Sequence, residues 1–180
     1  MSDAIDFLIG QHEQVEKLID QIKTAPADAR GALFDQFRES LAVHETAEEL
    51  ILRPSTRAAG EDGKRIAEER MAEENEAKQV LADLEKLDPA SDAFLTEFGA
   101  FAADVLEHAT NEEQQEFPLV RRENDAERLA KMGKAMQTVE KVAPTHPHPN
   151  AKSTTANAVL GPFASIMDRT RDAISAALKD

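Results

Sequence analysis

The sequence of 180 residues contains no cysteine, no tryptophan and no tyrosine. A chain without cysteine has no disulfide framework, no thiolate ligand for a metal and no cysteine nucleophile. Glycine is also scarce, and proline is concentrated toward the C-terminus, so the composition favours long helices over a sheet. The lack of cysteine fits a cytoplasmic protein, and we expect that location.

Basic residues are too few to balance the acidic ones. The chain has 35 Asp and Glu against 21 Lys and Arg, which gives a formal net charge of −14. This charge argues against nucleic acid and against anionic membrane surfaces as partners. No apolar run is long enough to span a bilayer, and the first residues lack the apolar stretch of a signal peptide. We therefore expect neither a nucleic-acid partner nor a membrane partner.

A short pattern of histidine, glutamate and proline occurs twice in the chain. In each copy a histidine is followed by glutamate four and five residues later and by proline ten residues later: His44, Glu48, Glu49 and Pro54, then His108, Glu112, Glu113 and Pro118. Residues four apart lie on one face of a helix, one turn from each other. Each copy therefore directs an imidazole and a carboxylate toward one point, as a pair of metal ligands does. Two such pairs in one small domain suggest a two-metal site.

Apolar residues recurring with helical period predict four long helices. They cover residues 3–23, 31–52, 64–87 and 92–117. Four amphipathic helices joined by short loops form an all-α, up-down-up-down four-helix bundle. The repeat of 64 residues between the two histidine patterns makes this bundle two copies of a helix pair.

Cap and breaker residues predict where these helices begin and end. Ser2 or Asp3 is expected to cap the first helix, and Ser91 the fourth. Gly60–Gly63 is expected to form a turn before the third helix. Pro54 is expected to end or kink the second helix, because proline has no N–H for the helical ladder.

A C-terminal segment follows the bundle. We assign residues 1–122 to the bundle and 123–180 to the appended segment. The segment is divided into a fifth helix over 126–142, a proline-containing linker over 143–161 and a final amphipathic helix over 162–178. Met132 and Met136 on the fifth helix are expected to pack rather than to bind metal. The final helix is expected either to fold back on the bundle or to pack against a partner subunit.

Five polar residues interrupt the apolar faces of the predicted helices: His12, His44, Glu48, His108 and Glu112. The repeat should place a partner of His12 on the third helix. The apolar residues around His12 recur at the same offsets around Glu74, so Glu74 is the predicted residue at that position. Glu73 is the nearest rival, because it also lies toward the apolar face.

This arrangement resembles that of the bacterial hemerythrin-like proteins with the HHE cation-binding domain. In their pattern a lone His precedes His-x-x-x-Glu, and a second lone His precedes a second His-x-x-x-Glu. The resemblance implies two non-haem iron ions, cycling between Fe2+ and Fe3+, inside a four-helix bundle. The two Glu of the pairs would bridge the ions, together with an oxo or hydroxo group from solvent. The implied ligands are His12, His44, Glu48, Glu74, His108 and Glu112.

Two positions depart from the pattern that the resemblance implies. Glu74 stands where the family has its second lone His, which gives three histidines and three carboxylates. Many relatives carry an aromatic residue, often Tyr, before the proline, and here the residues are Arg53 and Phe117. A site richer in carboxylate is harder and more anionic. We expect it to favour Fe(III) and peroxide or oxidase chemistry over reversible carriage of O2.

Each candidate also has a simpler interpretation. A lone histidine on an apolar face, such as His12, is usually a core residue with one partner. Six ionisable groups on inward faces are different, because burying them without a cation is too costly. Glu49 and Glu113 are expected to be solvated or bonded to a ligand, and Glu16 to lie on the surface. The segment that starts at His44 lacks the second histidine of the zinc-protease motif, which we reject.

The leading functional prediction is redox chemistry of O2 or H2O2 at a di-iron site, most concretely the disproportionation of peroxide, a catalase-like activity. The first alternative is a module that binds or senses O2 or NO, or handles iron, without turnover. The second alternative is an interaction protein whose metal site is vestigial or holds zinc. Its mark would be a bundle that is equally stable with and without metal.

Overall fold

The computed structural model describes residues 3–142, and all regular elements in that range are helical. The first half holds α1 (Ala4–Thr24), α2 (Ala27–Ala47), the π-helix η1 (Glu48–Leu52) and α3 (Arg53–Ala58). The second half holds α4 (Gly60–Leu84), α5 (Asp92–Asn111), the π-helix η2 (Glu112–Glu116), α6 (Phe117–Glu123) and α7 (Ala126–Val142).

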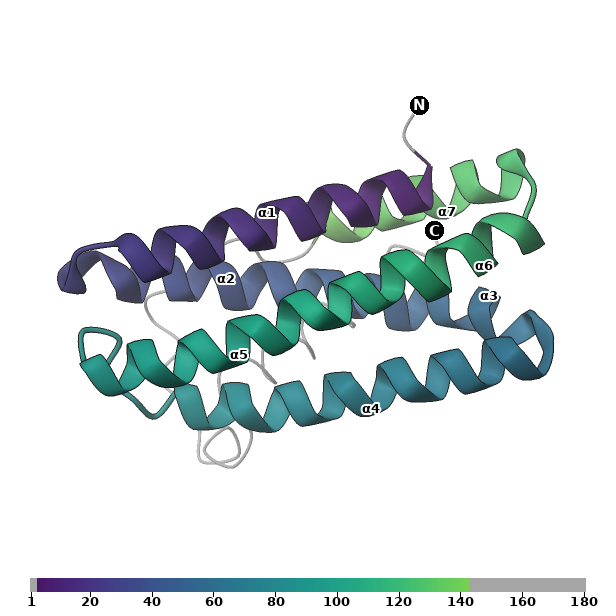
Figure 1. Cartoon of the computed structure of the whole chain (residues 1–180). Coiled ribbons are helices and arrows are strands. Elements are labelled where there is room, and N and C mark those ends of the chain that lie inside the picture. Colours follow the sequence, from purple (N-terminus) through teal and green to yellow (C-terminus); the bar gives the residue numbers. More distant parts are fainter. Residues whose placement is uncertain (1–2, 143–180) are drawn as a thin grey trace, which may run out of the picture.

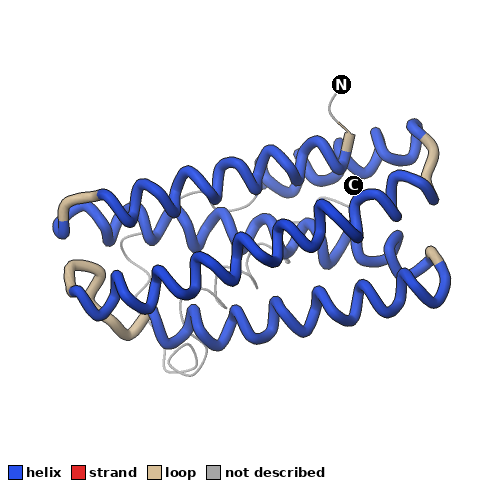
Figure 2. Tube along the Cα trace, viewed as in Figure 1, coloured by secondary structure: helices blue, strands red, loops and turns tan. Residues whose placement is uncertain are grey.

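Four long helical rods lie side by side with alternating direction (Figures 1 and 2). The rods are α1, α2 continued through η1 and α3, α4, and α5 continued through η2 and α6. The loops after α1 and α4 lie at one end of the bundle (Figure 1). The opposite end holds the start of α1 together with α3, α6 and α7. The predicted all-α, up-down-up-down bundle is confirmed.

Two of the predicted caps explain where helices begin. The side chain of Asp3 accepts hydrogen bonds from the backbone N–H groups of Ile5 and Asp6, both at 2.9 Å. The side chain of Ser91 accepts one from the N–H of Phe94 at 3.1 Å. Each cap satisfies donors that the first helical turn leaves unpaired.

The predicted starts of the second and third helices are wrong, and the third helix ends at Leu84 rather than at residue 87. The second helix begins at Ala27, not at residue 31, because Pro26 precedes the first turn, where its missing N–H costs nothing. The expected turn over Gly60–Gly63 is the start of α4 instead. Gly60 reverses the chain within one residue by adopting a φ of +85°, which an L side chain rarely adopts. The following three residues are therefore free to be helical.

Each histidine repeat leads into a π-helix rather than into a helix end. The N–H of Arg53 donates to the carbonyl of Glu48, and that of Phe117 donates to the carbonyl of Glu112. Both bonds span five residues. The next residue in each case is proline, which has no N–H and clashes with the carbonyl four residues earlier. The helix therefore widens for one turn and continues, so Pro54 does not end it.

Two apolar cores divide the bundle along its length. The core nearer the α1–α2 loop contains a cluster of phenylalanines: Phe34, Phe37, Phe94, Phe98 and Phe101. The other core joins the start of α1 to α6 and α7, with Ile5, Leu8, Phe117, Met132 and Met136. The predicted packing role of the two methionines is confirmed. On the first rod His12 lies between Leu8 of one core and Val15 of the other, and on the fourth rod His108 and Glu112 lie between Ala102 and Phe117.

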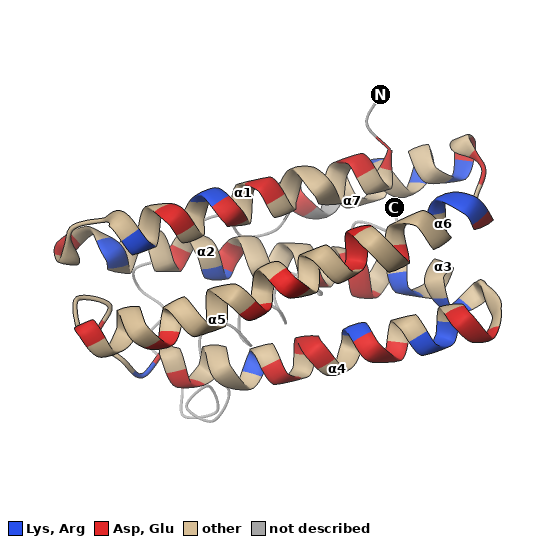
Figure 3. Cartoon of the chain, viewed as in Figure 1, with Lys and Arg blue, Asp and Glu red and all other residues tan. Residues whose placement is uncertain are grey.

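The remaining C-terminal predictions have different outcomes. The fifth helix is α7, whose bounds match the prediction, and it packs against α1. The linker over 143–161 and the helix over 162–178 lie outside the described residues, and the division at residue 122 stays a prediction. Among the helices of residues 3–142, none combines the length and apolarity needed to cross a membrane. Acidic and basic residues are spread along all four rods (Figure 3).

Candidate metal centre

The six predicted residues converge from all four rods. His12 comes from α1 and Glu74 from α4, while each histidine repeat supplies a His from an α-helix and a Glu from the first residue of a π-helix. Two groups bring one ligand atom per residue within 4.8 Å of one another. The His12 group is His12, His44, Glu48 and Glu112, and the His108 group is Glu48, Glu74, His108 and Glu112. Glu48 and Glu112 belong to both groups.

The carboxylate of Glu112 lies between the histidines of the two groups. Its Oε2 lies 3.3 Å from Nε2 of His12 and 3.8 Å from Nε2 of His44. Its Oε1 lies 3.3 Å from Nε2 of His108. Oε2 of Glu48 lies 3.5 Å from Nε2 of His44. Each oxygen of Glu112 therefore faces a different group, which is the arrangement of a bridging carboxylate.

A polar partner on the outer nitrogen fixes the orientation of each imidazole. Nδ1 of His44 lies 3.1 Å from Oε1 of Gln11. The other two outer nitrogens bond to carboxylates: Nδ1 of His12 to Glu113 at 2.8 Å, and Nδ1 of His108 to Glu73 at 2.7 Å. With a proton on each Nδ1, the lone pair of Nε2 points into the centre, as metal-bound histidines require.

The neighbours of the predicted ligands take the roles of supports. Glu113 bonds to a candidate ligand, as predicted, and Glu49 is exposed. Glu73 bonds to the outer side of His108, whereas Glu74 contributes to the His108 group. Within the described residues the geometry thus separates the two rivals, while the role of Glu74 as a ligand stays a prediction. Glu16 is exposed beside the pocket.

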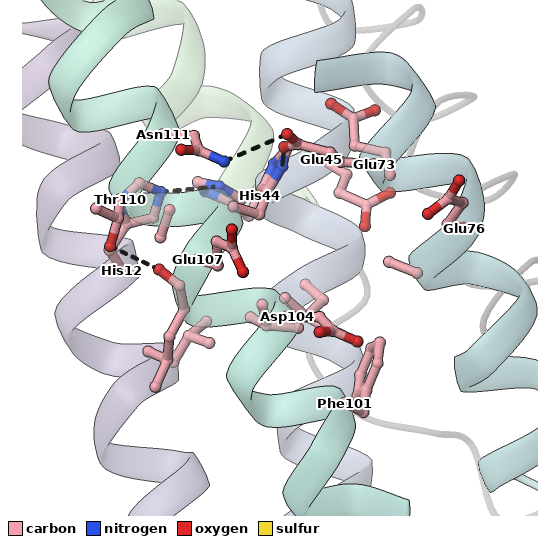
Figure 4. Close-up of a pocket in the computed structure, with 18 of the residues that line it drawn as sticks. His12, His44, Glu45, Glu73, Glu76, Phe101, Asp104, Glu107, Thr110 and Asn111 are labelled. Atoms are coloured by element: carbon pink, nitrogen blue, oxygen red, sulfur yellow. Dashed lines mark hydrogen bonds and ion pairs between the residues drawn. The ribbon is translucent and has the colours of Figure 1, made fainter. Parts of the chain in front are cut away.

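A pocket of about 580 Å³ reaches the centre from its histidine side (Figure 4). Its buried end is lined by His12, His44 and His108. Leu81 and Phe101 contribute apolar wall. Its lining also includes exposed carboxylates: Glu76, Asp104 and Glu107. A small molecule entering this pocket meets the candidate ligands directly.

Burial and mutual charge displace the pKa values of the clustered groups. Burial lowers the pKa of His44 to about 4, so its imidazole is neutral at pH 7. Burial also acts to lower the pKa of His108, but the charge of Glu112, which lies 3.3 Å from Nε2, and the hydrogen bond to Glu73 outweigh it and raise the pKa to about 9. Burial and the charge of Glu112 raise the pKa of Glu48 well above its ordinary value. Burial and neighbouring charge therefore set the pKa values of the centre together.

The donor atoms of the cluster fit a divalent cation. Oε1 of Glu48, Oε2 of Glu112 and Nε2 of His108 are buried and make no hydrogen bond of acceptable geometry with the described residues, although charged neighbours lie close to them. A buried polar atom without a partner costs about 1–3 kcal/mol, and more when it is charged. All three atoms belong to residues of the two groups and are of the kinds that bind metal, so a bound cation would satisfy them.

Two charged residues that lie in the centre were not predicted from the sequence. Arg53 is 1% exposed, and its guanidinium pairs with Glu48, Glu74, Glu112 and Glu116. Glu116 is fully buried and also accepts a hydrogen bond from the hydroxyl of Thr56. The sequence carried one signal for Glu116, because it follows Glu112 by four residues. Arg53 follows Glu48 by five residues, and the two side chains share a face only because that turn is a π-helix.

Fold and site together define a helical-bundle protein with a buried His/Glu centre of the metal-binding kind. The family model described as hemerythrin HHE cation binding domain matches residues 3–120, and the chain belongs to this family. The resemblance inferred from the histidine pattern is confirmed. Membership implies binding of metal, iron in particular, and the His/Glu cluster is where the described residues fit it.

A solved structure has a similar fold. It is the crystal structure of a hemerythrin HHE cation binding domain-containing protein from Mycobacterium kansasii, with a TM-score of 0.68 and 24% sequence identity. The match covers 76% of this chain and 84% of the other. No curated protein matches the chain.

Proposed function

We propose that the protein is a non-haem di-iron protein that reacts with O2 or H2O2, most concretely by disproportionating peroxide. The observation that carries the proposal is the pair of ligand groups sharing Glu48 and Glu112. His12 and His44 would complete one iron site, and Glu74 and His108 the other. Imidazole with carboxylate is a donor set that suits iron. A bridging oxo or hydroxo group remains part of this proposal.

A bound iron pair would supply reversible electron exchange with O2 or H2O2, and the chain supplies its surroundings. Gln11, Glu113 and Glu73 hold the three imidazoles through Nδ1, so their Nε2 atoms stay aimed at the centre. The pocket admits a molecule the size of peroxide to the histidine side. Because H2O2 is neutral at pH 7, the carboxylates of the pocket do not repel it.

The departure at Glu74 shapes the proposed chemistry. A third carboxylate makes the centre harder and more anionic, which stabilises Fe(III) and disfavours reversible O2 carriage. The Glu74→His variant, loaded with iron, is expected to form a longer-lived oxygenated species on exposure to air. Absorbance spectra of reduced protein mixed with air measure that lifetime. An unchanged lifetime would remove Glu74 as the cause.

A second candidate function is binding of O2, NO or iron without turnover. The family match is equally compatible with it, and the exposed carboxylates of the pocket favour uptake of a cation. The spectrum of reduced protein exposed to air separates the two functions. A persistent adduct favours binding, whereas prompt oxidation with O2 evolution from added peroxide favours turnover.

Metal content is the primary test. After anaerobic ferrous loading, elemental analysis is expected to find two irons per chain, and none in the Glu48→Ala, Glu112→Ala double variant, which lacks both shared carboxylates. Peroxide added to the loaded protein should then release one O2 for every two H2O2 consumed, measured with an oxygen electrode. Zinc alone, or no stoichiometric metal after loading, would overturn the proposal and favour the interaction-protein alternative.

A further inference from the structure

The Arg53 guanidinium lies among the carboxylates of the proposed metal centre. Its Nη2 lies 2.9 Å from Oε1 of Glu112 and 3.4 Å from Oε2 of Glu48, and it also donates to Oε1 of Glu74. Its Nη1 donates to Glu116. Arginine keeps its charge at any pH that a protein tolerates. A permanent cation of the chain is therefore bound at this place.

The three carboxylates that receive Nη2 are the three carboxylates of the His108 group. The contact with Glu112 is through Oε1, the oxygen that also faces His108, while Oε2 faces the histidines of the His12 group. Nη2 and a metal ion in the His108 group would therefore draw on the same carboxylates, and at Glu112 on the oxygen that faces His108. In the His12 group only Glu48 would be shared through the same oxygen atom.

We propose that Arg53 is an internal competitor for the second cation, so that the two metal ions bind in order. The His12 group takes its ion first and tightly. The ion of the His108 group must displace Nη2 from Glu74 and Glu112, and so binds more weakly. This inference rests on the proposed di-iron function and specifies how its two sites differ.

Glu116 and Thr56 give the displaced guanidinium a place to remain. Nη1 already pairs with Glu116, and Thr56 donates its hydroxyl to the other oxygen of that carboxylate. Arg53 can release Nη2 and keep a charged partner, so displacement does not leave a buried cation alone. Without Glu116, Arg53 would depend wholly on the carboxylates that the ion needs.

The test is stepwise binding of ferrous ion under anaerobic conditions, by equilibrium dialysis with elemental analysis. The wild-type protein is expected to show two steps of unequal affinity. Arg53→Met should tighten the second step by about tenfold or more and leave the first nearly unchanged. Glu116→Gln should weaken the second step by about tenfold, since Arg53 then holds the shared oxygens more firmly.

Lys78→Met is the charge-matched control. It removes a positive charge 3.9 Å from Glu74, but Lys78 pairs with Glu74 and Glu45 rather than with Glu48 or Glu112. A long-range field effect would move both steps, and would act similarly in Lys78→Met and Arg53→Met. Displacement predicts a selective change in the second step, larger for Arg53→Met.

The outcomes separate this inference from the proposed function. Two equal steps in the wild type, or a second step that Arg53→Met leaves unchanged, would overturn the competitor and leave the di-iron site standing. Should Arg53→Met not fold, Glu116→Gln decides alone, and an unchanged or tightened second step in it would overturn the competitor. Wild-type protein that binds no ferrous ion would overturn both the function and the inference.

Discussion

Four carboxylates converge on the Arg53 guanidinium, and removing that cation leaves them facing one another. Without added metal, Arg53→Met is expected to lower the free energy of unfolding by about 3–5 kcal/mol, the cost of breaking a buried charge pair from one side. Urea denaturation at pH 7 with a chelator present measures it. Ferrous loading should restore more stability to this variant than to the wild type, because the ions replace the missing charge.

The adjacent glutamates Glu73 and Glu74 offer a sharper test of the ligand set. Glu73→Gln keeps both iron sites but weakens the hydrogen bond that orients His108. The affinity of the His108 group for iron should therefore fall about 10–100-fold, as it does when other partners of metal-bound histidines are changed. Glu74→Gln removes a ligand of the His108 group, so one iron per chain should be lost. Dialysis against graded ferrous ion measures both effects, and Glu76→Gln in the pocket wall is the control. Two irons retained in Glu74→Gln with one lost in Glu73→Gln would reverse the assignment.

Among individual residues, the sequence predicted those whose polar side chains stand at apolar positions of a helix. His12 and His44 interrupt apolar stripes of helical period, and Glu74 was found by matching the apolar offsets of His12. Arg53 could not be found in this way. On an α-helix a residue five positions after Glu48 lies off its face, and the two meet only in a π-helix. A search for residues that recur with the α-helical period of 3.6 therefore does not predict that contact.

At the junction of α3 and α4, the two helices approach so closely that only a residue without a side chain fits at Gly63. A Cβ on Gly63 would lie 2.0 Å from the carbonyl oxygen of Thr56, whereas a Cβ on Gly99, within α5, would meet nothing within 4 Å. Gly63→Ala is therefore expected to destabilise the bundle by about 1–3 kcal/mol through overpacking. Gly99→Ala should stabilise it by about 0.5–1 kcal/mol through the backbone entropy of glycine.

Thermal denaturation of the two alanine variants checks this contrast. Both substitutions add the same methyl group to a helix, so helix propensity cancels in the comparison. Equal shifts of the two variants would mean that the close approach of Gly63 to Thr56 carries no energy.

Element boundaries were predicted less well than element types. Apolar period alone predicted all four rods, because each rod buries one stripe against the cores. The start at Ala27 and the reversal at Gly60 depend on single backbone angles, which no apolar pattern records. The π-turns were equally hidden. A proline indicates that a hydrogen bond is missing, but the packing on both sides decides whether the helix ends or widens.

The whole molecule has a formal net charge of −14, and carboxylates line the pocket that leads to the centre. Such a field attracts cations and is weakened by salt. The rate of Co(II) binding, followed by stopped-flow absorbance, is expected to fall about tenfold or more as the Debye length shrinks from about 30 Å to about 3 Å. The rate at which the iron-loaded protein reacts with neutral H2O2 should change little over the same range of salt concentration.

Local and global charge are distinguished by two variants with equal net charge. Asp104→Asn with Glu107→Gln removes two carboxylates beside the pocket (Figure 4), and Asp92→Asn with Glu97→Gln removes two exposed ones nearer the start of the same helix. If the pocket is the route by which cations reach the centre, the first pair should slow Co(II) binding more, because field lines concentrate in a concave acidic opening. Equal rates in the two variants would mean that only the net charge acts and that the entry path lies elsewhere.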